Sequence, residues 1–336
     1  MPRALILKGG GVKGLAFVGA LKTLEEFDLT FDTFVGTSAG AITAVLLASG
    51  YTATELEIAM SRKDFTEFLD GGGRIASLWR LIRRGWIHTG EPIVDWIESL
   101  LRAKFPQRHS AEKVRLDELP RRVVLYAARS SGGEVVFDSR LVRASYSASV
   151  AARYSASIPG FFRDEKFELE PIYDGGMLNN FPVEIFLRDN PDEEFIALNL
   201  LETKKKGASP WIVRLPLVRL LIAVVNIQLK QREPQILQKY ASRIVNINTG
   251  EVETTQFCLS NVEKDFLVAA GRCAALQFIA RHMPERKLSA TLLINETERT
   301  FELARLVDVR RRIPRRFLRK VPRKLLLLVI LAVLCV

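Results

Sequence analysis

Ser38 lies at the centre of a G-x-S-x-G pentapeptide whose outer residues are Gly36 and Gly40. Residues 31–35, which are expected to form a short strand, precede it, and small, mostly apolar residues follow over Ala39–Ala48. A serine between a strand and a helix in this pattern is typical of a nucleophile elbow, where side chains beside the tight turn would clash. The N–H groups at the start of the helix also stabilise a developing oxyanion. The pattern predicts a nucleophile at Ser38; the alternative is an ordinary tight turn rich in small residues.

A run of three glycines, Gly9, Gly10 and Gly11, follows the apolar stretch Ala4–Leu7, with Lys13 close behind. Consecutive glycines allow backbone N–H groups to converge on an anion. The run lacks the Gly-Lys-Ser/Thr ending of a P-loop, and it is not followed by the distant acid of a dinucleotide-binding motif. A phosphate-binding loop and a plain turn remain alternatives. An oxyanion hole fits better, because the elbow serine follows about two dozen residues later.

Asp174 begins an Asp-Gly-Gly triplet directly after residues 171–173, which are expected to form a strand. Active sites of parallel sheets lie at the carboxyl ends of the strands, so this position predicts a functional carboxylate. The alternative is a simple Asp-Gly turn. The same triplet occurs at Asp70, but there it follows a charged, helix-like stretch, and we interpret that copy as a loop.

The first fifty residues alternate strand, loop and helix twice, which is typical of a parallel sheet covered by helices. Further strands are expected at residues 122–128, 135–138, 171–174, 195–200 and 244–247. Helices are expected at residues 15–27, 93–104, 146–155, 211–231 and 262–281. Residues 61–90 and 203–210 are charged and less patterned, and we expect loops or lids there. Within the first stretch, Trp79, Arg80, Arg83, Arg84 and Trp86 fit either a lid that meets lipid headgroups or a helix with buried tryptophans and a solvated basic face. No internal repeat or linker precedes residue 306, so we expect one domain over 1–305 and a separate tail over 306–336.

The net charge of +11 is concentrated in this tail. Residues 310–324 hold nine Lys or Arg and no acid, which leaves +2 for the rest of the chain (11 − 9). Residues 325–336 are apolar throughout, and a basic cluster beside an apolar segment favours an anionic membrane over nucleic acid. As a helix this segment would extend about 18 Å, whereas a bilayer core is about 30 Å thick. We therefore expect a peripheral membrane anchor and no nucleic-acid partner.

The three cysteines, Cys258, Cys273 and Cys335, have no metal-type spacing and are too few for a disulfide framework. No cluster of residues suggests a metal site, and no motif suggests a cofactor. The N-terminus runs directly into an expected core strand and lacks the cleavage pattern of a signal peptide. We expect a cytoplasmic, peripherally membrane-associated protein; the oligomeric state stays open.

Together, the three motifs resemble those of the patatin-like phospholipase family. That family carries a Gly-Gly-Gly-x-Lys/Arg-Gly loop, a Gly-x-Ser-x-Gly elbow, and an Asp-Gly-Gly/Ala followed by Asn-x-Pro. All three occur here in that order, with Asn180 and Pro182 completing the last. Residues 156–159, Ala-Ser-Ile-Pro, resemble the family's Ala-Ser-x-x-x-Pro segment but are spaced two residues tighter. The likeness covers residues 4–188, is weaker to about residue 281, and excludes the tail.

The resemblance implies a three-layer α/β/α sandwich with a mainly parallel sheet and a Ser–Asp dyad without histidine. Carried over, Ser38 is the nucleophile and Asp174 its base. Gly10 and Gly11, in the loop that begins at Gly9, would supply oxyanion N–H groups, and Lys13 would add positive charge. The implied activity is hydrolysis of carboxylic esters in membrane lipids, of the phospholipase A or lysophospholipase type.

Two other interpretations stay open. The order Ser38, Asp174, His282 would also suit a Ser-His-Asp α/β-hydrolase, although His282 ends a helical stretch, where a capping role is the ordinary one. The chain has two other histidines, His88 and His109. The second alternative is a catalytically silent membrane-binding protein on the same fold.

Overall fold

The computed structural model describes residues 3–70, 72–107, 112–141, 143–163, 165–167, 169–201 and 233–294. The predictions for the tail over 306–336, for the apolar stretch 211–231 and for the loop 203–210 lie outside these residues.

All the expected strands are present, with ends shifted by at most two residues, and β5 is present in addition. The strands are β1 Ala4–Leu7, β2 Thr33–Thr37, β3 Arg122–Arg129, β4 Glu134–Asp138, β5 Glu165–Phe167, β6 Glu170–Asp174, β7 Phe195–Leu201 and β8 Ile244–Asn248. The α-helices are α1 Leu15–Glu26, α2 Ala39–Ala48, α3 Ala53–Arg62, α4 Arg74–Arg84, α5 Glu91–Lys104, α6 Ala148–Ser155, α7 Gly176–Asn179, α8 Val183–Asp189 and α10 Asn261–His282.

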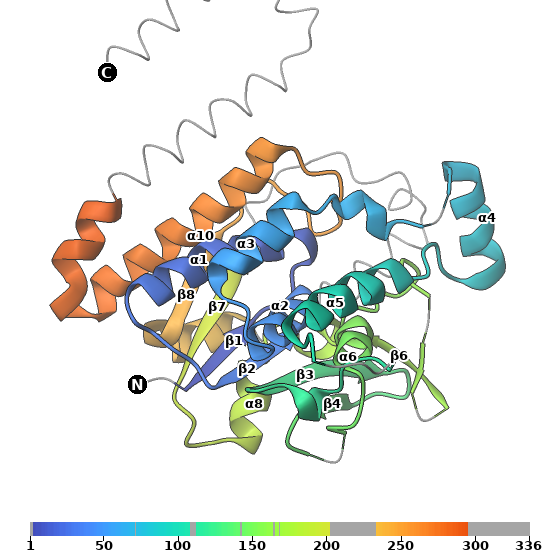
Figure 1. The fold of residues 1–336 in the computed structure, drawn as a ribbon, viewed down its shortest axis with the longest axis horizontal. Helices are drawn as coiled ribbons and strands as arrows, with labels where there is room; N and C mark the ends of the chain where they lie inside the picture. The colour runs from blue at the N-terminus through green and yellow to red at the C-terminus, as the bar shows by residue number, and fades with distance from the viewer. Residues whose placement is uncertain are drawn as a thin grey trace, which may run out of the picture.

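The strands form one eight-stranded mixed sheet, ordered β5-β6-β3-β2-β1-β7-β8, with β4 paired to β3 (Figure 1). β1 lies between β2 and β7. The four pairs β3–β2, β2–β1, β1–β7 and β7–β8 are parallel. β4 and β6 run antiparallel to β3, and β5 runs antiparallel to β6. The predicted sheet, mainly parallel at its centre, is therefore present, with an antiparallel edge.

Helices cover both faces of the sheet, as alternate residues of β1 show. Leu5 and Leu7 are buried in a large core with residues of α1, α2, α5, α6 and α10. Ala4 and Ile6 face the other way, into a smaller core that includes Phe186 of α8. Figure 1 shows α1 and α10 on one side of the sheet and α8 on the other. This confirms the expected three-layer α/β/α arrangement.

Residues 61–90, expected to be a loop or lid, contain a regular helix, α4. It begins after the glycine-rich residues 71–73 and ends at Gly85, whose φ of 80° is the left-handed conformation typical of a helix C-terminus.

In the described part of the chain, no helix is both long enough and apolar enough to cross a bilayer.

Candidate active site

Ser38 lies at a sharp turn between the end of β2 and the first residue of α2. Its φ of 54° and ψ of −122° are unusual for a residue with a side chain, and such conformations cost about 1–3 kcal/mol. The two glycines beside it are required by close packing. A Cβ on Gly36 would lie 2.3 Å from the carbonyl oxygen of Gly40, and a Cβ on Gly40 would lie 2.3 Å from that of Leu7. The sequence motif therefore forms the strand–turn–helix elbow that it predicts.

The pairing of β3 explains how Asp174 comes level with this elbow. On one edge of β3, β2 occupies Arg122 to Tyr126, and its last residue, Thr37, pairs with Tyr126. β4 occupies the opposite edge. β6 therefore shares the first edge with β2, approaches it from the opposite direction, and places Asp174 beside Ala127. Ser38, one residue beyond Thr37, is at the level of Ala127 too.

The sequence argument for Asp174 assumed a parallel strand, and that assumption is wrong. β6 is antiparallel to β3, so Asp174 does not lie at a common carboxyl edge of parallel strands. Instead, β2 and β6 pair with consecutive stretches of the same edge of β3 and meet end to end, and this register places Asp174 at the elbow. This arrangement depends on pairing between distant segments, which local sequence does not specify.

The Asp174 carboxyl is buried and incompletely paired. Its Oδ1 accepts a hydrogen bond of 2.7 Å from the N–H of Gly176, whereas the buried Oδ2 has no partner of standard hydrogen-bond geometry among the described residues. Burial raises the pKa of Asp174 to about 6, although the Ser38 hydroxyl, the Gly176 N–H and the charge of Arg153 each lower it. A carboxyl with this pKa is poised to exchange a proton near neutral pH.

The C-terminal end of α6 binds both Ser38 and the Asp174 segment. The Ser155 hydroxyl accepts a 3.0 Å hydrogen bond from the Ser38 N–H and donates a 2.6 Å bond to the Tyr126 carbonyl. The Ser157 carbonyl accepts from the Asp174 N–H at 2.8 Å. These bonds fix the two backbones relative to each other.

Sequence reasoning missed Ser155 because it counted the Ala-Ser-x-x-x-Pro segment from Ser157. Counted from Ser155, three residues precede Pro159, which is the family's spacing. The two-residue discrepancy was therefore a usable signal, and Tyr154 replaces the motif's alanine.

The glycine loop lies against the same centre. The Gly9 N–H donates to the carbonyl oxygen of Asn180 at 2.9 Å, and a Cβ on Gly9 would come within 3.2 Å of the Ser38 Cβ. The missing side chain of Gly9 therefore lets the loop approach Ser38 closely. The N–H of Gly9 is already hydrogen-bonded to Asn180. In the described structure, the N–H groups of Gly10 and Gly11 donate to no protein acceptor. Lys13 is buried, and its side chain passes beside Gly10.

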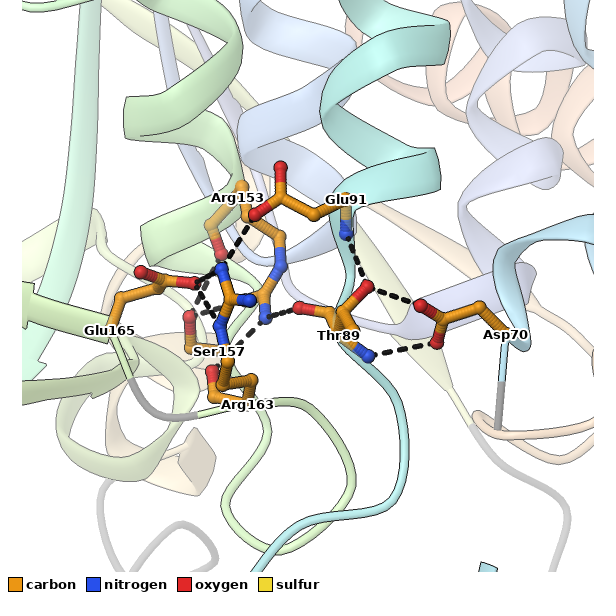
Figure 2. A network of polar contacts seen from close by, with 7 residues as sticks. All are labelled: Asp70, Thr89, Glu91, Arg153, Ser157, Arg163 and Glu165. Atoms are coloured by element: carbon orange, nitrogen blue, oxygen red, sulfur yellow. Dashed lines mark hydrogen bonds and ion pairs between the residues drawn. The ribbon is translucent and has the colours of Figure 1, made fainter. Parts of the chain in front are cut away.

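Arg153 is a buried cation whose charge acts on Asp174, and Figure 2 shows its polar contacts. Its guanidinium donates to the Ser157 hydroxyl at 2.6 Å and to the carbonyl oxygens of Thr89 and Arg163 at 2.9 and 3.2 Å. Burial lowers the pKa of Arg153 to about 10, and the carboxylates of Glu165 and Glu91 partly offset this decrease. Arg153 therefore stays charged at neutral pH. Its charge favours the ionised form of Asp174. No sequence motif pointed to this residue.

Of the histidines, His88 and His282 lie within the described residues. His88 is buried, with its Nδ1 3.7 Å from Asp70, and burial lowers its pKa. His282 ends α10 and packs its ring on Phe278. Neither forms a hydrogen bond with Ser38 or Asp174 in the described structure. Asp70 follows a short 3-10 helix and binds Thr89, consistent with the predicted loop. The described residues also contain no cluster of side chains suited to hold a metal ion.

The sequence model of the family described as Patatin-like phospholipase matches residues 5–187, more than half of the chain. The chain belongs to this family. The match spans the glycine loop, the elbow, the end of α6 and Asp174, which the structure brings together.

Curated relatives of this patatin-like chain match along most of its length. YqhO of Bacillus subtilis is 29% identical over 287 residues, covering 80% of this chain and 94% of that protein. The probable lipid hydrolase 463L of Invertebrate iridescent virus 6 is 22% identical, covering 78% and 91%. An NTE family protein of Mycobacterium bovis, Mb2594, is 28% identical, covering 74% of this chain and 40% of its own length.

Solved structures share the fold. VipD from Legionella pneumophila superposes with a TM-score of 0.56 at 17% identity, covering 84% of this chain and 67% of VipD. ExoU in the ExoU–SpcU complex of Pseudomonas aeruginosa gives a TM-score of 0.52 at 20% identity, covering 84% and 52%. At these identities the likeness concerns the fold alone.

Proposed function

We propose that this patatin-like chain is a lipid acyl hydrolase with Ser38 as nucleophile and Asp174 as base. The Asp174 carboxylate takes the hydroxyl proton of Ser38 as Oγ attacks the ester carbonyl carbon. The tetrahedral intermediate then expels the alcohol, which receives that proton from Asp174. The acyl group is left on Ser38. Water attacks this acyl-enzyme, Asp174 accepts its proton and returns it to Ser38, and the fatty acid leaves.

The glycine loop supplies the oxyanion hole in this mechanism. The N–H groups of Gly10 and Gly11 are the donors, since that of Gly9 is occupied by Asn180. Lys13 adds positive charge beside them. Such donors act when negative charge develops on the carbonyl oxygen, and loss of one typically costs about 10²–10³ in rate.

One observation carries the proposal: a strained serine at an elbow lies level with a buried aspartate whose pKa is raised to about 6. Structural turns rarely hold a serine at positive φ, and buried carboxylates are usually fully paired. Perturbed groups of this kind cluster at functional sites.

Mixed lipid vesicles test the function directly. We expect the chain to release free fatty acid from glycerophospholipids or lysophospholipids, detected by mass spectrometry of the extracted lipids. The identity of the second product distinguishes a phospholipase A from a lysophospholipase. A Ser38→Ala preparation gives the background. Release no greater than this background for every lipid class would refute the proposal.

Ser155→Ala is expected to lower kcat for a soluble ester about tenfold, because it removes a hydrogen-bond partner that positions Ser38. The unpaired Ser38 N–H should also lower the free energy of unfolding by about 1–3 kcal/mol. Ser149→Ala is the matched control: Ser149 is a buried serine of the same helix that donates to Glu98 at 2.9 Å. It should cost similar stability in urea unfolding and leave kcat unchanged. Equal kcat losses in both variants would show that Ser155 contributes only to stability.

Membrane association through residues 306–336 remains part of the proposal. Its support is the charge pattern of that segment, nine basic residues followed by an apolar run. Such a tail would hold the active site near its lipid substrate.

A further inference from the structure

Helix α4 presents large apolar side chains to solvent. Trp79 is 61% exposed and Ile82 77% exposed. Three residues apart, they lie on one side of the helix, with Arg83 beside Trp79. Isolated exposed apolar residues are ordinary, but an exposed tryptophan and isoleucine on one helix face mark an interaction surface.

The same surface is strongly basic. Residues 71–89 contain four arginines and no acid. The Arg83 guanidinium lies 4.9 Å from the Trp79 ring, and those of Arg80 and Arg84 lie 5.6 and 5.7 Å from the Trp86 ring. Within the described part of the chain, no carboxylate forms an ion pair with Arg80, Arg83 or Arg84. We call Trp79, Ile82, Arg83 and Arg84 the α4 surface.

Polar contacts hold the base of this segment in place. Arg80 donates to the Ile87 carbonyl at 2.8 Å, and Asp70 accepts from the N–H of Thr89 at 2.8 Å. Figure 2 shows that Thr89 in turn contacts Arg153, the buried cation whose charge acts on Asp174. These bonds join the two flanks of α4 to each other, and Thr89 on its C-terminal flank connects them to the part of the fold that carries the candidate active site.

α4 also packs on the segment next to Asp174. A Cβ on Gly160 would lie 3.8 Å from the Gly85 carbonyl oxygen and 3.9 Å from Leu81. The His88 N–H donates to the Phe161 carbonyl at 2.9 Å. This turn follows Ser157 directly, so the α4 surface and the active site share one side of the fold. Figure 1 shows α4 projecting beyond its neighbours there.

We propose that the α4 surface docks on anionic lipid bilayers. Arginines bind lipid phosphates, while tryptophan and isoleucine enter the interface between headgroups and acyl chains. The exposed apolar pair favours a bilayer over nucleic acid, which would leave Ile82 without an apolar partner. The proposal rests on the proposed lipid hydrolysis and names the surface that brings the active site to its substrate.

Hydrogen exchange of the full chain tests the docking. It reports protection segment by segment, so contact through α4 is distinguished from contact through another part of the chain. Vesicles of phosphatidylcholine with phosphatidylglycerol should protect the amides of residues 74–86, and vesicles of phosphatidylcholine alone should not. Three results would overturn the proposal: no binding to anionic vesicles, binding that leaves these amides unprotected, and protection that grows with protein concentration before vesicles are added. The second result would place the anchor elsewhere, as in residues 306–336. The third would indicate a second copy of the chain on this surface.

Variants complete the test. Trp79→Ser/Ile82→Ser should raise the apparent Kd for anionic vesicles at least about tenfold, and Arg83→Gln/Arg84→Gln about 30-fold at low salt. The matched control is Leu288→Ser/Leu292→Ser, at exposed leucines four residues apart that are 77% and 66% exposed; it should bind like the original chain. If all three variants bind equally, the proposal fails.

Hydrolysis of a soluble ester separates this inference from the proposed function. The two α4 variants should retain it, because they do not touch Ser38 or Asp174. A chain that binds vesicles through α4 but hydrolyses no ester would refute the enzyme and leave the docking surface intact.

Discussion

Ser38→Ala is expected to lower kcat for a soluble ester by about 10⁴-fold or more, as loss of a nucleophile does in serine hydrolases. The reason is that the acyl-enzyme cannot form without Oγ, and the oxyanion donors alone retain little of the rate. Initial rates with a chromogenic short-chain ester measure the loss. A fluorophosphonate probe should label the original chain and fail to label the variant.

Ser49→Ala provides the matched control. Ser49 is a buried serine at the other end of α2, where it donates to the Leu46 carbonyl at 2.7 Å, and its loss should leave labelling intact. Ser38→Gly gives a second inactive variant, since glycine adopts a φ of 54° without strain. Normal labelling of Ser38→Ala would exclude Ser38 from the mechanism.

The sequence predicted features that depend on neighbouring residues. The β2–α2 elbow follows from glycines around a serine between apolar stretches, and an added Cβ at either glycine would collide with backbone. The strands β1, β3, β4 and β7 follow from short apolar runs with turn residues between them. The family resemblance supplied the three-layer arrangement, which the two cores on opposite faces of β1 confirm.

The antiparallel direction of β6 could not be predicted in this way. It depends on which edge of β3 remains free beyond the end of β2, and this is set by pairing between segments that lie from 43 to 89 residues apart in the chain. The sequence left α4 open between a lid and a helix, for a different reason. Its arginines and the preceding glycines obscure the helical period, although Trp79, Ile82 and Arg83 have the spacing of one face.

The charge of Asp174 opposes stability and serves activity. Burial raises its pKa from 3.8 to about 6, so the folded chain binds this proton more tightly than the unfolded chain. The resulting stabilisation is complete below about pH 4 and is lost as the pH rises through about 6. Activity has the opposite dependence because the base must be ionised. We expect kcat/KM for a soluble ester to rise about tenfold per pH unit up to about pH 6 and then level off.

Asp174→Asn should therefore be inactive and yet more stable at alkaline pH. We expect kcat to fall about 10⁴-fold, because the amide cannot accept the Ser38 proton. Its oxygen can still accept the Gly176 N–H, so the local backbone should be retained. Removing the buried charge should raise the free energy of unfolding at pH 8 by about 3 kcal/mol. Urea unfolding at pH 8 and pH 4 measures this gain, which should disappear at the lower pH.

His282→Gln distinguishes the dyad from a histidine triad. The dyad needs no imidazole, and His282 contacts Phe278 at the end of α10, so this variant should keep the activity of the original chain. A folded His282→Gln chain that has lost hydrolysis would favour the alternative triad of Ser38, Asp174 and His282. An Asp174→Asn chain that is inactive but less stable at pH 8 would also count against the dyad. In that case the ionised carboxylate would stabilise the fold, and the lost activity would reflect a disrupted structure rather than a missing base.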